Sequence, residues 1–237
     1  MNRWPACIML DMDYTLVDSS DAIVVCIAHA LTEMGHRPAP PDAIRATIGL
    51  SLPAAYAQLT GSDAGTQEAR RFSALFLARS DETMVAGTRL LPGAAEAVRA
   101  LHARGHRLAI VTSKRARIVR EVLARDGLLG LFETVIGSED VARHKPDPTP
   151  LLLCLERLGC PPEAVLYVGD AVADARAAEA AGVAFCWVLT GVTPREQLTA
   201  YPADAILDSV ADLVAWVEGT QKTPPTPNGV GGVGARS

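Results

Sequence analysis

The sequence has 237 residues, of which 49% are hydrophobic and 21% charged, and its formal net charge at pH 7 is −5. This hydrophobic content excludes a chain that is disordered throughout, and the acidic balance excludes the basic field that attracts nucleic acids or anionic membranes. Every apolar run is far shorter than the roughly 20 residues of a membrane span, and the N-terminus lacks the apolar core of a signal peptide. We therefore expect a cytoplasmic protein with no nucleic-acid or membrane partner.

Short apolar runs alternate with helical patterns from residue 89 onward, which indicates βαβ units that build a parallel sheet. One helix opens at Pro92 and Gly93 and ends at Gly105, and a later helix ends at Gly159. The expected strands cover residues 6–10, 108–112, 133–136, 165–168 and 184–189. The sequence thus predicts an α/β fold with a doubly wound, Rossmann-like parallel sheet.

Residues 19–85 interrupt this alternation, because they carry helical periods and no strand signal. They predict an inserted all-helical domain, here called the cap, on a core made of residues 1–18 and 86–219. Residues 220–237 are rich in Thr, Pro and Gly and predict a disordered tail. The G-x-G-x-x-G pattern in this tail follows no strand and precedes no helix, so we do not interpret it as a phosphate-binding loop.

The five cysteines include no C-x-x-C pair. Cys7, Cys154 and Cys186 lie in apolar segments, where a thiol acts as a small hydrophobe. This usage suits a reducing compartment. The histidines show no zinc-ligand spacing relative to the cysteines, so we expect no zinc site.

Two carboxylates, Asp11 and Asp13, follow the first expected strand. At the end of a strand they lie close together, so each raises the pKa of the other unless a cation lies between them. A hard divalent cation such as Mg²⁺ takes this kind of oxygen ligand. The alternative is an ordinary turn in which Asp13 or Thr15 caps a helix.

A second acidic pair, Asp170 and Asp174, follows the strand expected at residues 165–168. Acids at a helix N-terminus are favourable with the helix dipole, so Asp174 also has a purely structural interpretation. In an open parallel sheet, however, ligands bind beyond the carboxyl ends of the strands, where Asp11 and Asp170 would converge.

Hydroxyl and ammonium groups follow two further strands. Thr112 and Ser113 could bond a phosphoryl oxygen or cap the next helix, and capping is the better interpretation for Ser113. Lys145 precedes a proline in a loop, where a lysine is usually solvated.

Four sequence blocks, taken in chain order, resemble the motifs of the haloacid dehalogenase superfamily of phosphatases and phosphotransferases. They are D-x-D-x-T from Asp11, the apolar strand that ends in Thr112, K-P-x-P from Lys145, and G-D-x-x-x-D from Gly169. Finer features such as Leu91-Pro92-Gly93 look like its phosphoglycolate phosphatase branch, which has a helical cap.

The resemblance implies covalent phosphoryl transfer, with Asp11 as the nucleophile and Asp13 as the general acid and then the base. Thr112, Ser113 and Lys145 would bind the phosphoryl group. The implied cofactor is Mg²⁺, with the ligands Asp11, Asp13 through its main-chain carbonyl, Asp170, and Asp174 through ordered waters.

Two positions depart from the family pattern. Tyr14 stands where many relatives have Gly and would narrow the space beside the nucleophile. Ala171 replaces a common Ser or Thr and would remove a hydroxyl near the metal. The acid at Asp13 argues against a dehalogenase, because the family's dehalogenases need no proton transfer there.

The resemblance favours a Mg²⁺-dependent phosphatase for a small phosphorylated metabolite, with 2-phosphoglycolate as the leading candidate. The cap would set specificity through residues such as Arg45 and Gly49. A sugar-phosphate mutase, a pyrophosphatase and a nucleotidase remain open within the enzyme class. A non-catalytic scaffold with this fold is a further alternative, although it would be expected to lack one of the catalytic positions, and all are present.

Overall fold

A computed structural model describes residues 4–220 of the chain. The expected disorder of residues 221–237, and the G-x-G-x-x-G pattern within them, lie outside the described residues. Residue 220 was expected to begin this tail, but it ends the helix α10 (Leu213–Thr220). Within residues 4–220, no helix combines the length and the apolar character that crossing a bilayer requires.

The core is built on a six-stranded sheet in which all neighbouring strands are parallel. The strand order is β5-β4-β1-β6-β7-β8, so β1 lies between β4 and β6. The strands are β1 (Cys7–Leu10), β4 (Arg107–Val111), β5 (Phe132–Ile136), β6 (Val165–Gly169), β7 (Ala184–Val188) and β8 (Ala205–Leu207). The doubly wound α/β prediction is confirmed, and five of these strands match the expected ones closely.

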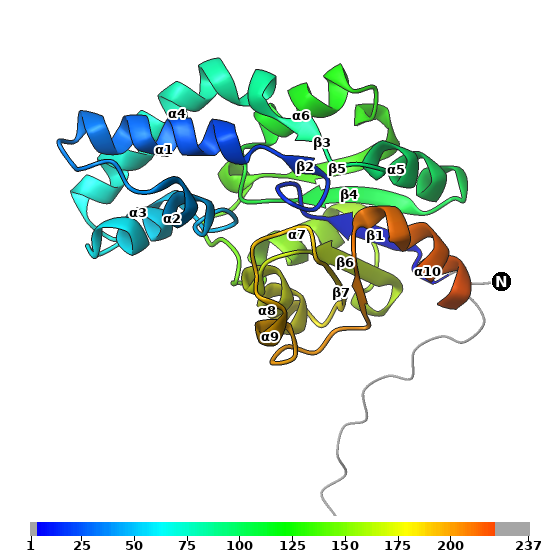
Figure 1. The fold of residues 1–237 in the computed structure, drawn as a ribbon. Helices are drawn as coiled ribbons and strands as arrows, with labels where there is room; N and C mark the ends of the chain where they lie inside the picture. Colours follow the sequence, from blue (N-terminus) through cyan, green and yellow to red (C-terminus); the bar gives the residue numbers. More distant parts are fainter. Residues whose placement is uncertain (1–3, 221–237) are drawn as a thin grey trace, which may run out of the picture.

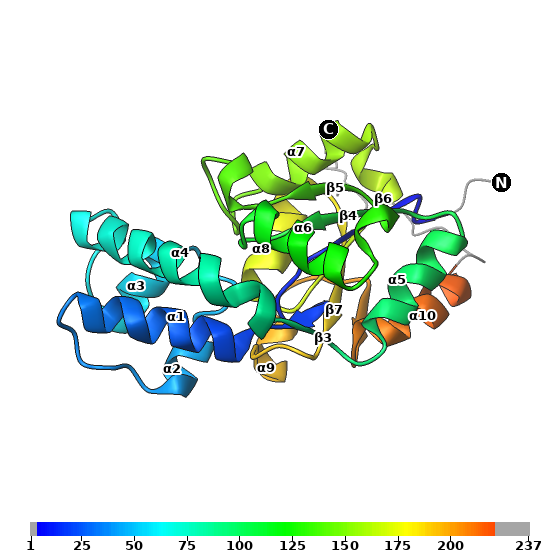
Figure 2. The same cartoon turned by 90° about the horizontal axis from the view of Figure 1, so that it is seen from above.

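Helices cover both faces of the sheet (Figures 1 and 2). Side chains of β1 alternate between the faces: Ile8 and Leu10 belong to one buried cluster, whereas Cys7 and Met9 belong to the other. The first cluster contains side chains of α5 (Ala94–Ala103), α6 (Ala116–Arg125) and α10, and the second those of α7 (Thr149–Leu158), α8 (Val172–Ala181) and α9 (Arg195–Leu198). Both faces of every central strand are therefore buried, as a parallel sheet requires.

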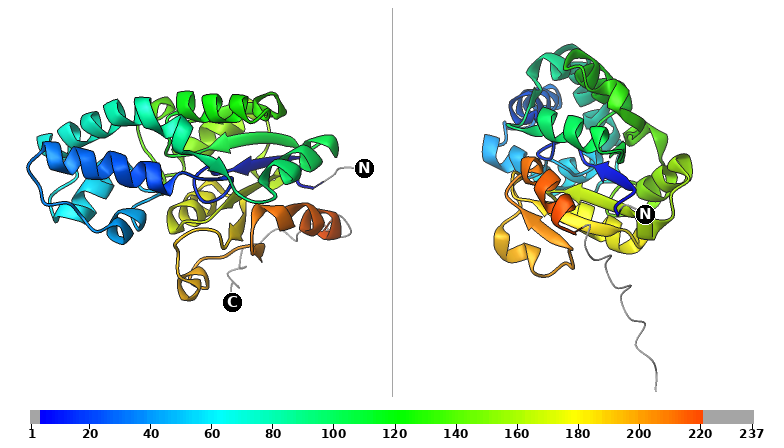
Figure 3. Two further views of the ribbon diagram at one scale, coloured as in Figure 1. Left: turned by 45° about the horizontal axis from the view of Figure 1, so that its top comes forward. Right: turned by 90° about the vertical axis from the view of Figure 1, so that its right-hand side faces the viewer.

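The cap lies beside one end of the sheet, drawn in blue and cyan in Figure 1 and extending to the left in the left-hand view of Figure 3. Its helices are α1 (Ser20–Glu33), α2 (Pro41–Arg45), α3 (Leu52–Thr60) and α4 (Gln67–Gly87). The two chain connections to the core pair as short antiparallel strands, β2 (Val17–Asp18) and β3 (Arg89–Leu90). The all-helical insertion is confirmed, while α4 runs to Gly87, past the boundary expected at residue 85.

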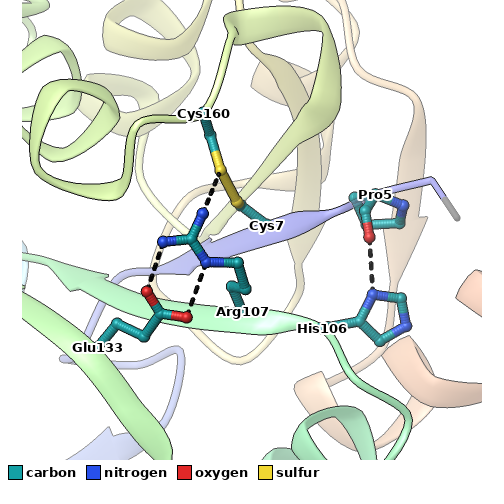
Figure 4. Close-up of a disulfide and its surroundings, with 6 residues drawn as sticks. All are labelled: Pro5, Cys7, His106, Arg107, Glu133 and Cys160. Carbon is teal, nitrogen blue, oxygen red and sulfur yellow. Dashed lines mark hydrogen bonds and ion pairs between the residues drawn. A yellow bond between two sulfur atoms is a disulfide. The ribbon is translucent and has the colours of Figure 1, made fainter. Parts of the chain in front are cut away.

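One expectation about the cysteines is wrong. Cys7 was interpreted as a free apolar thiol, but it forms a disulfide with Cys160, which follows α7 (Figure 4). The two residues are 153 positions apart, so their spacing gave no sign of the pairing. Arg107 donates a hydrogen bond to the Cys160 sulfur and binds Glu133 on β5.

Cys154 and Cys186 are buried thiols, as expected, and burial raises the pKa of each to about 12.

Candidate active site

The residues singled out in the sequence meet at the carboxyl ends of the three central strands. Asp11 follows β1, Thr112 follows β4, and Asp170 follows β6. The chain winds outward in both directions from β1, so these strand ends flank the point where strand order reverses. Ligands of doubly wound folds bind at this point.

A buried network of charges holds Asp11. The ammonium of Lys145 donates to Asp11 Oδ1 at 2.9 Å, to Asp174 Oδ1 at 2.6 Å and to the Tyr167 hydroxyl at 3.0 Å. Lys145 is only 6% exposed, so the interpretation of a solvated loop lysine is wrong. The Asp11 main chain is fixed as well, because its N–H donates to the Val168 carbonyl at 2.9 Å.

Burial sets the protonation of this network. It raises the pKa of Asp11 to about 7; Lys145 opposes the shift, and the negative charge of Asp174 adds to it. Burial and the neighbouring carboxylates also raise the pKa of Asp170 well above its usual range. For Lys145 burial acts to lower the pKa, but Asp11 and Asp174 outweigh it and the pKa is raised. The site therefore holds more carboxylates than its own cation can neutralise.

The same carboxylates fit a divalent cation. Asp11, Asp170 and Asp174 each offer an oxygen, and these atoms lie within 4.8 Å of one another. Among residues 4–220, these three buried carboxylates face a single buried ammonium, that of Lys145. A divalent ion would balance the remaining negative charge, and carboxylate oxygens are the ligands that Mg²⁺ prefers.

The three carboxylates are not equally open. Asp174 Oδ1 accepts from Lys145 and Tyr167, and its Oδ2 accepts from the N–H of Ala171 at 3.0 Å. By contrast, Asp170 Oδ1 accepts only a long bond of 3.5 Å, from the Thr15 hydroxyl. Asp11 and Asp170 therefore keep oxygen lone pairs for a ligand, whereas Asp174 is committed to protein donors.

Asp13 belongs to a second polar cluster at the same strand end. Its Oδ1 accepts a short hydrogen bond from the Ser19 hydroxyl and lies 3.2 Å from the ammonium of Lys114. Lys114 also donates to the Ser19 hydroxyl at 3.1 Å. The Asp13 side chain is 13% exposed and lines a cavity, so it can exchange protons with a molecule bound there. Asp13 is not a helix cap, because α1 has no side-chain cap.

Thr112 and Ser113 take different positions. The Thr112 side chain accepts from the N–H of Lys114 at 3.2 Å and lines the cavity. Ser113 does not cap α6, whose N-cap residue is Arg115. Instead, the Ser113 hydroxyl donates to the carbonyl of Gly49 at 3.1 Å and so ties the core to the cap.

The structure separates the two cap residues chosen for specificity. Gly49 lines the cavity, but Arg45 does not. Arg45 forms ion pairs with Asp21 at 2.5 Å and with Asp42 at 3.8 Å. The structure thus brings Gly49, but not Arg45, to the other predicted site residues.

The backbone around the site is tightly folded. Tyr14 has φ of 59°, in the left-handed region that a side chain disfavours and glycine tolerates. It is 9% exposed and does not line the cavity, so it does not narrow the space there as expected. At Gly191 an added Cβ would overlap the carboxylate of Asp170, so only glycine lets this loop pass so close.

Three residues of the site were missed in the sequence. Tyr167 lies inside an apolar strand, although a buried tyrosine hydroxyl needs a partner and is itself a signal. Lys114 directly follows two residues that were singled out, and Ser19 lies six residues after Asp13. The partners of Lys114 and Ser19 become visible only when the loops after β1 and β4 are brought together.

A cavity of about 530 Å³ opens over these strand ends, between the core and the cap. Its floor is polar and includes Asp11, Asp13, Thr112 and Lys114. Its roof, here defined by the apolar side chains that the cap contributes, includes Ile23, Ile48, Leu50, Leu52, Phe76 and Leu77. A molecule held here would touch the carboxylates at one end and apolar side chains at the other.

Residues 8–188 match the sequence model of the haloacid dehalogenase-like hydrolase family. The chain belongs to this family. It is 34% identical over 212 residues to the phosphoglycolate phosphatase of Cereibacter sphaeroides, which covers 87% of this chain and 96% of that relative. It is also 32% identical to a protein of Dickeya dadantii named "Probable phosphatase IndB", over 93% of this chain and 96% of the relative.

Solved structures agree with this assignment. The crystal structure of a protein from Bacteroides fragilis described as a haloacid dehalogenase-like hydrolase superposes with a TM-score of 0.85 at 36% identity. The match covers 88% of this chain and 99% of that one. The family and these relatives make the chain an enzyme of the phosphatase class, in the branch that resembles phosphoglycolate phosphatases.

Proposed function

We propose that the chain is a Mg²⁺-dependent phosphomonoester hydrolase that forms an aspartyl-phosphate on Asp11. The position of the Asp11 carboxylate carries the proposal. It is buried, it lines the floor of the cavity, and Lys145 occupies its Oδ1. The hydrogen bonds of the described residues leave Oδ2 open, so this oxygen is available to attack phosphorus.

In the first step, Asp11 Oδ2 attacks phosphorus and the bond from phosphorus to the alcohol oxygen breaks. Asp13 gives its proton to that oxygen, which leaves as an alcohol. Lys145 holds the other oxygen of Asp11 in place, and the Thr112 hydroxyl lies on the same floor to bond a phosphoryl oxygen.

In the second step, water attacks the phosphorus carried by Asp11. Asp13, now a carboxylate, accepts a proton from the water, and the bond from phosphorus to the Asp11 oxygen breaks. Inorganic phosphate leaves, and both carboxyl groups return to their starting states. The hydrogen bond from Ser19 and the ion pair with Lys114 keep Asp13 in position for both proton transfers.

Mg²⁺ would bind to Asp11, to the main-chain carbonyl of Asp13 and to Asp170, and would offset negative charge on the carboxylates and the phosphoryl group. Asp174 would order the bound waters. This division of roles is supported by the hydrogen bonds that already occupy both oxygens of Asp174. The loop at Gly191 would hold Asp170 in place.

The substrate is a small phosphorylated metabolite on this proposal, and the names of the relatives favour 2-phosphoglycolate. A substrate-binding role for Arg45 would require it to leave Asp21 and turn toward the cavity. Cytoplasmic location remains part of the proposal.

Phosphate release from a panel of monoesters, pyrophosphate and nucleotides tests the function, with Mg²⁺ or EDTA present. Wild type should release phosphate only with the metal, and Asp11→Asn should release none. A mutase would instead transfer the phosphoryl group between sugar positions and release little phosphate. If wild type cleaves no compound faster than Asp11→Asn, the hydrolase proposal fails.

A further inference from the structure

The roof of the cavity differs in chemistry from its floor. Its side chains are apolar and come from α1, α3, α4 and the loop before α3; they include Ile23, Ile48, Leu50, Leu52, Phe76 and Leu77. Several of these are only half-buried in the protein, because part of their surface faces the cavity. The cavity volume of about 530 Å³ lies within the range of about 300–1,000 Å³ that holds drug-sized ligands, far more than a two-carbon acid needs.

The polar groups of the cap offer little to a second anion. The hydroxyls of Thr47 and Ser73 are used within the cap, since each donates to a main-chain carbonyl of its own segment, at 2.7 Å and 2.8 Å. Arg115, which lines the cavity from the core, is paired with Asp81 and also donates to the Leu77 carbonyl at 3.2 Å, although its buried Nε has no partner among the described residues. Arg70 lines the cavity from the cap, but its side chain is exposed to solvent, where water screens its charge. A carboxylate under this roof would lose its water without gaining a buried, unpaired cation.

We infer that the substrate is the phosphate monoester of an apolar alcohol, with the phosphoryl group on the floor and the organic group under the roof. This inference rests on the proposed function, because it places the phosphoryl group at Asp11. It departs from a carboxylate-bearing substrate such as 2-phosphoglycolate. Each methylene buried under the roof strengthens binding by roughly fourfold, since hydrophobic transfer is proportional to the area removed from water.

Non-hydrolysable phosphonates separate binding from turnover. Calorimetric titration of the full chain with Mg²⁺ should show the dissociation constant falling from ethyl- to butyl- to hexylphosphonate, by about tenfold or more over the series. The probe 3-phosphonopropionate carries a carboxylate in place of the apolar end and should bind more weakly than butylphosphonate. Equal affinities across the series, or tighter binding of 3-phosphonopropionate, would overturn the inference.

Leu50 offers a sharp variant, because it lines the cavity but is not part of the buried clusters. Leu50→Asn should weaken hexylphosphonate at least fivefold and leave methylphosphonate within twofold. Leu152→Asn is the matched control, since Leu152 is 47% exposed on α7 and does not line the cavity. Equal effects of the two variants on hexylphosphonate would contradict a role for the roof.

Turnover of the corresponding alkyl phosphates then tests the proposed function separately. These esters and 2-phosphoglycolate all carry primary alkyl oxygens at phosphorus. If the phosphonates bind as expected but none of the esters is hydrolysed, the apolar recognition stands and the hydrolase proposal fails. If 2-phosphoglycolate is hydrolysed with a higher kcat/KM than hexyl phosphate, the hydrolase proposal stands and the apolar inference fails.

Discussion

The floor and the roof of the cavity solve different physical problems. Charged side chains lie at the floor, and nearly every one of them forms a hydrogen bond or ion pair of defined geometry. Lys145, for example, donates to both Asp11 and Asp174. The roof consists of apolar side chains such as Leu50 and Leu77. These side chains restrict the size and polarity of a bound group, but they do not fix its orientation. Chemistry at phosphorus needs atoms held in one geometry, whereas recognition of an organic group can rest on burial alone. Substitutions should therefore affect the floor far more severely than the roof.

After the loss of the nucleophile Asp11, the largest effect on catalysis should come from Asp13. Asp13→Asn should lower kcat for an alkyl phosphate by about 10²–10⁴-fold, because both proton transfers are lost. With 2,4-dinitrophenyl phosphate, whose leaving group needs no proton, the variant should still give a rapid burst of nitrophenolate before slow turnover. Stopped-flow absorbance measures both phases. The exposed control Asp208→Asn should behave as wild type, and an unchanged kcat for Asp13→Asn would remove Asp13 from the chemistry.

The largest effect on stability should come from Lys145. Lys145→Met leaves Asp11 and Asp174 buried without their cation, and breaking a buried ion pair from one side costs about 3–5 kcal/mol. Urea denaturation in EDTA measures the loss of free energy of unfolding. A loss below about 1 kcal/mol would show that the network is not held together by this ammonium.

The metal-free protein should lose stability as pH rises. The pKa of Asp11 is raised from 3.8 to about 7 in the folded state, so the folded chain binds this proton more tightly than the unfolded chain. The contribution of this proton to the free energy of unfolding is fully present below pH 3.8 and is lost as pH rises through 7. The loss amounts to up to about 4 kcal/mol. Urea midpoints in EDTA between pH 5 and pH 8 measure it. Asp11→Asn should make the dependence shallower, and the slope that remains should come from Asp170, whose pKa is also raised. An equally steep fall in this variant would assign the dependence to groups other than Asp11.

A smaller effect should follow a change beside Asp170. Gly191→Ala would place a Cβ against the Asp170 carboxylate and displace it, so the Mg²⁺ concentration for half-maximal activity should rise about tenfold. Gly130→Ala is the matched control, because an added Cβ there meets open space. An unchanged Mg²⁺ requirement in Gly191→Ala would argue against Asp170 as a ligand.

The sequence predicted the floor better than the roof, for physical reasons. Asp11, Thr112 and Asp170 each directly follow an apolar strand, so the rule for parallel sheets was enough to bring them together. Tyr167 was not predicted as a site residue, because it lies in an apolar segment that is typical of a buried strand. Its place in the site depends on Lys145, which contacts it from a loop distant in sequence.

The roof follows no such rule. Leu50 and Leu77 are apolar residues of the kind that also fill the interior of a helical domain, so the sequence does not distinguish the two positions. Whether these side chains face a cavity depends on how short helices such as α3 pack. The position of Arg45 could not be predicted for the same reason. It was expected to set specificity, but it forms an ion pair with Asp21, which packing brings beside it. The strand β8 was missed because its three residues are too few to carry a periodic signal.

The most direct test of the account is to trap the phosphorylated enzyme. The full chain with Mg²⁺ is mixed with a ³²P-labelled monoester that it hydrolyses, quenched in acid within milliseconds, digested and mapped by mass spectrometry. The account predicts acid-stable, hydroxylamine-labile phosphate on the peptide that contains Asp11, and none in Asp11→Asn. Phosphate on another residue, or rapid turnover with no protein-bound phosphate at any quench time, would contradict it.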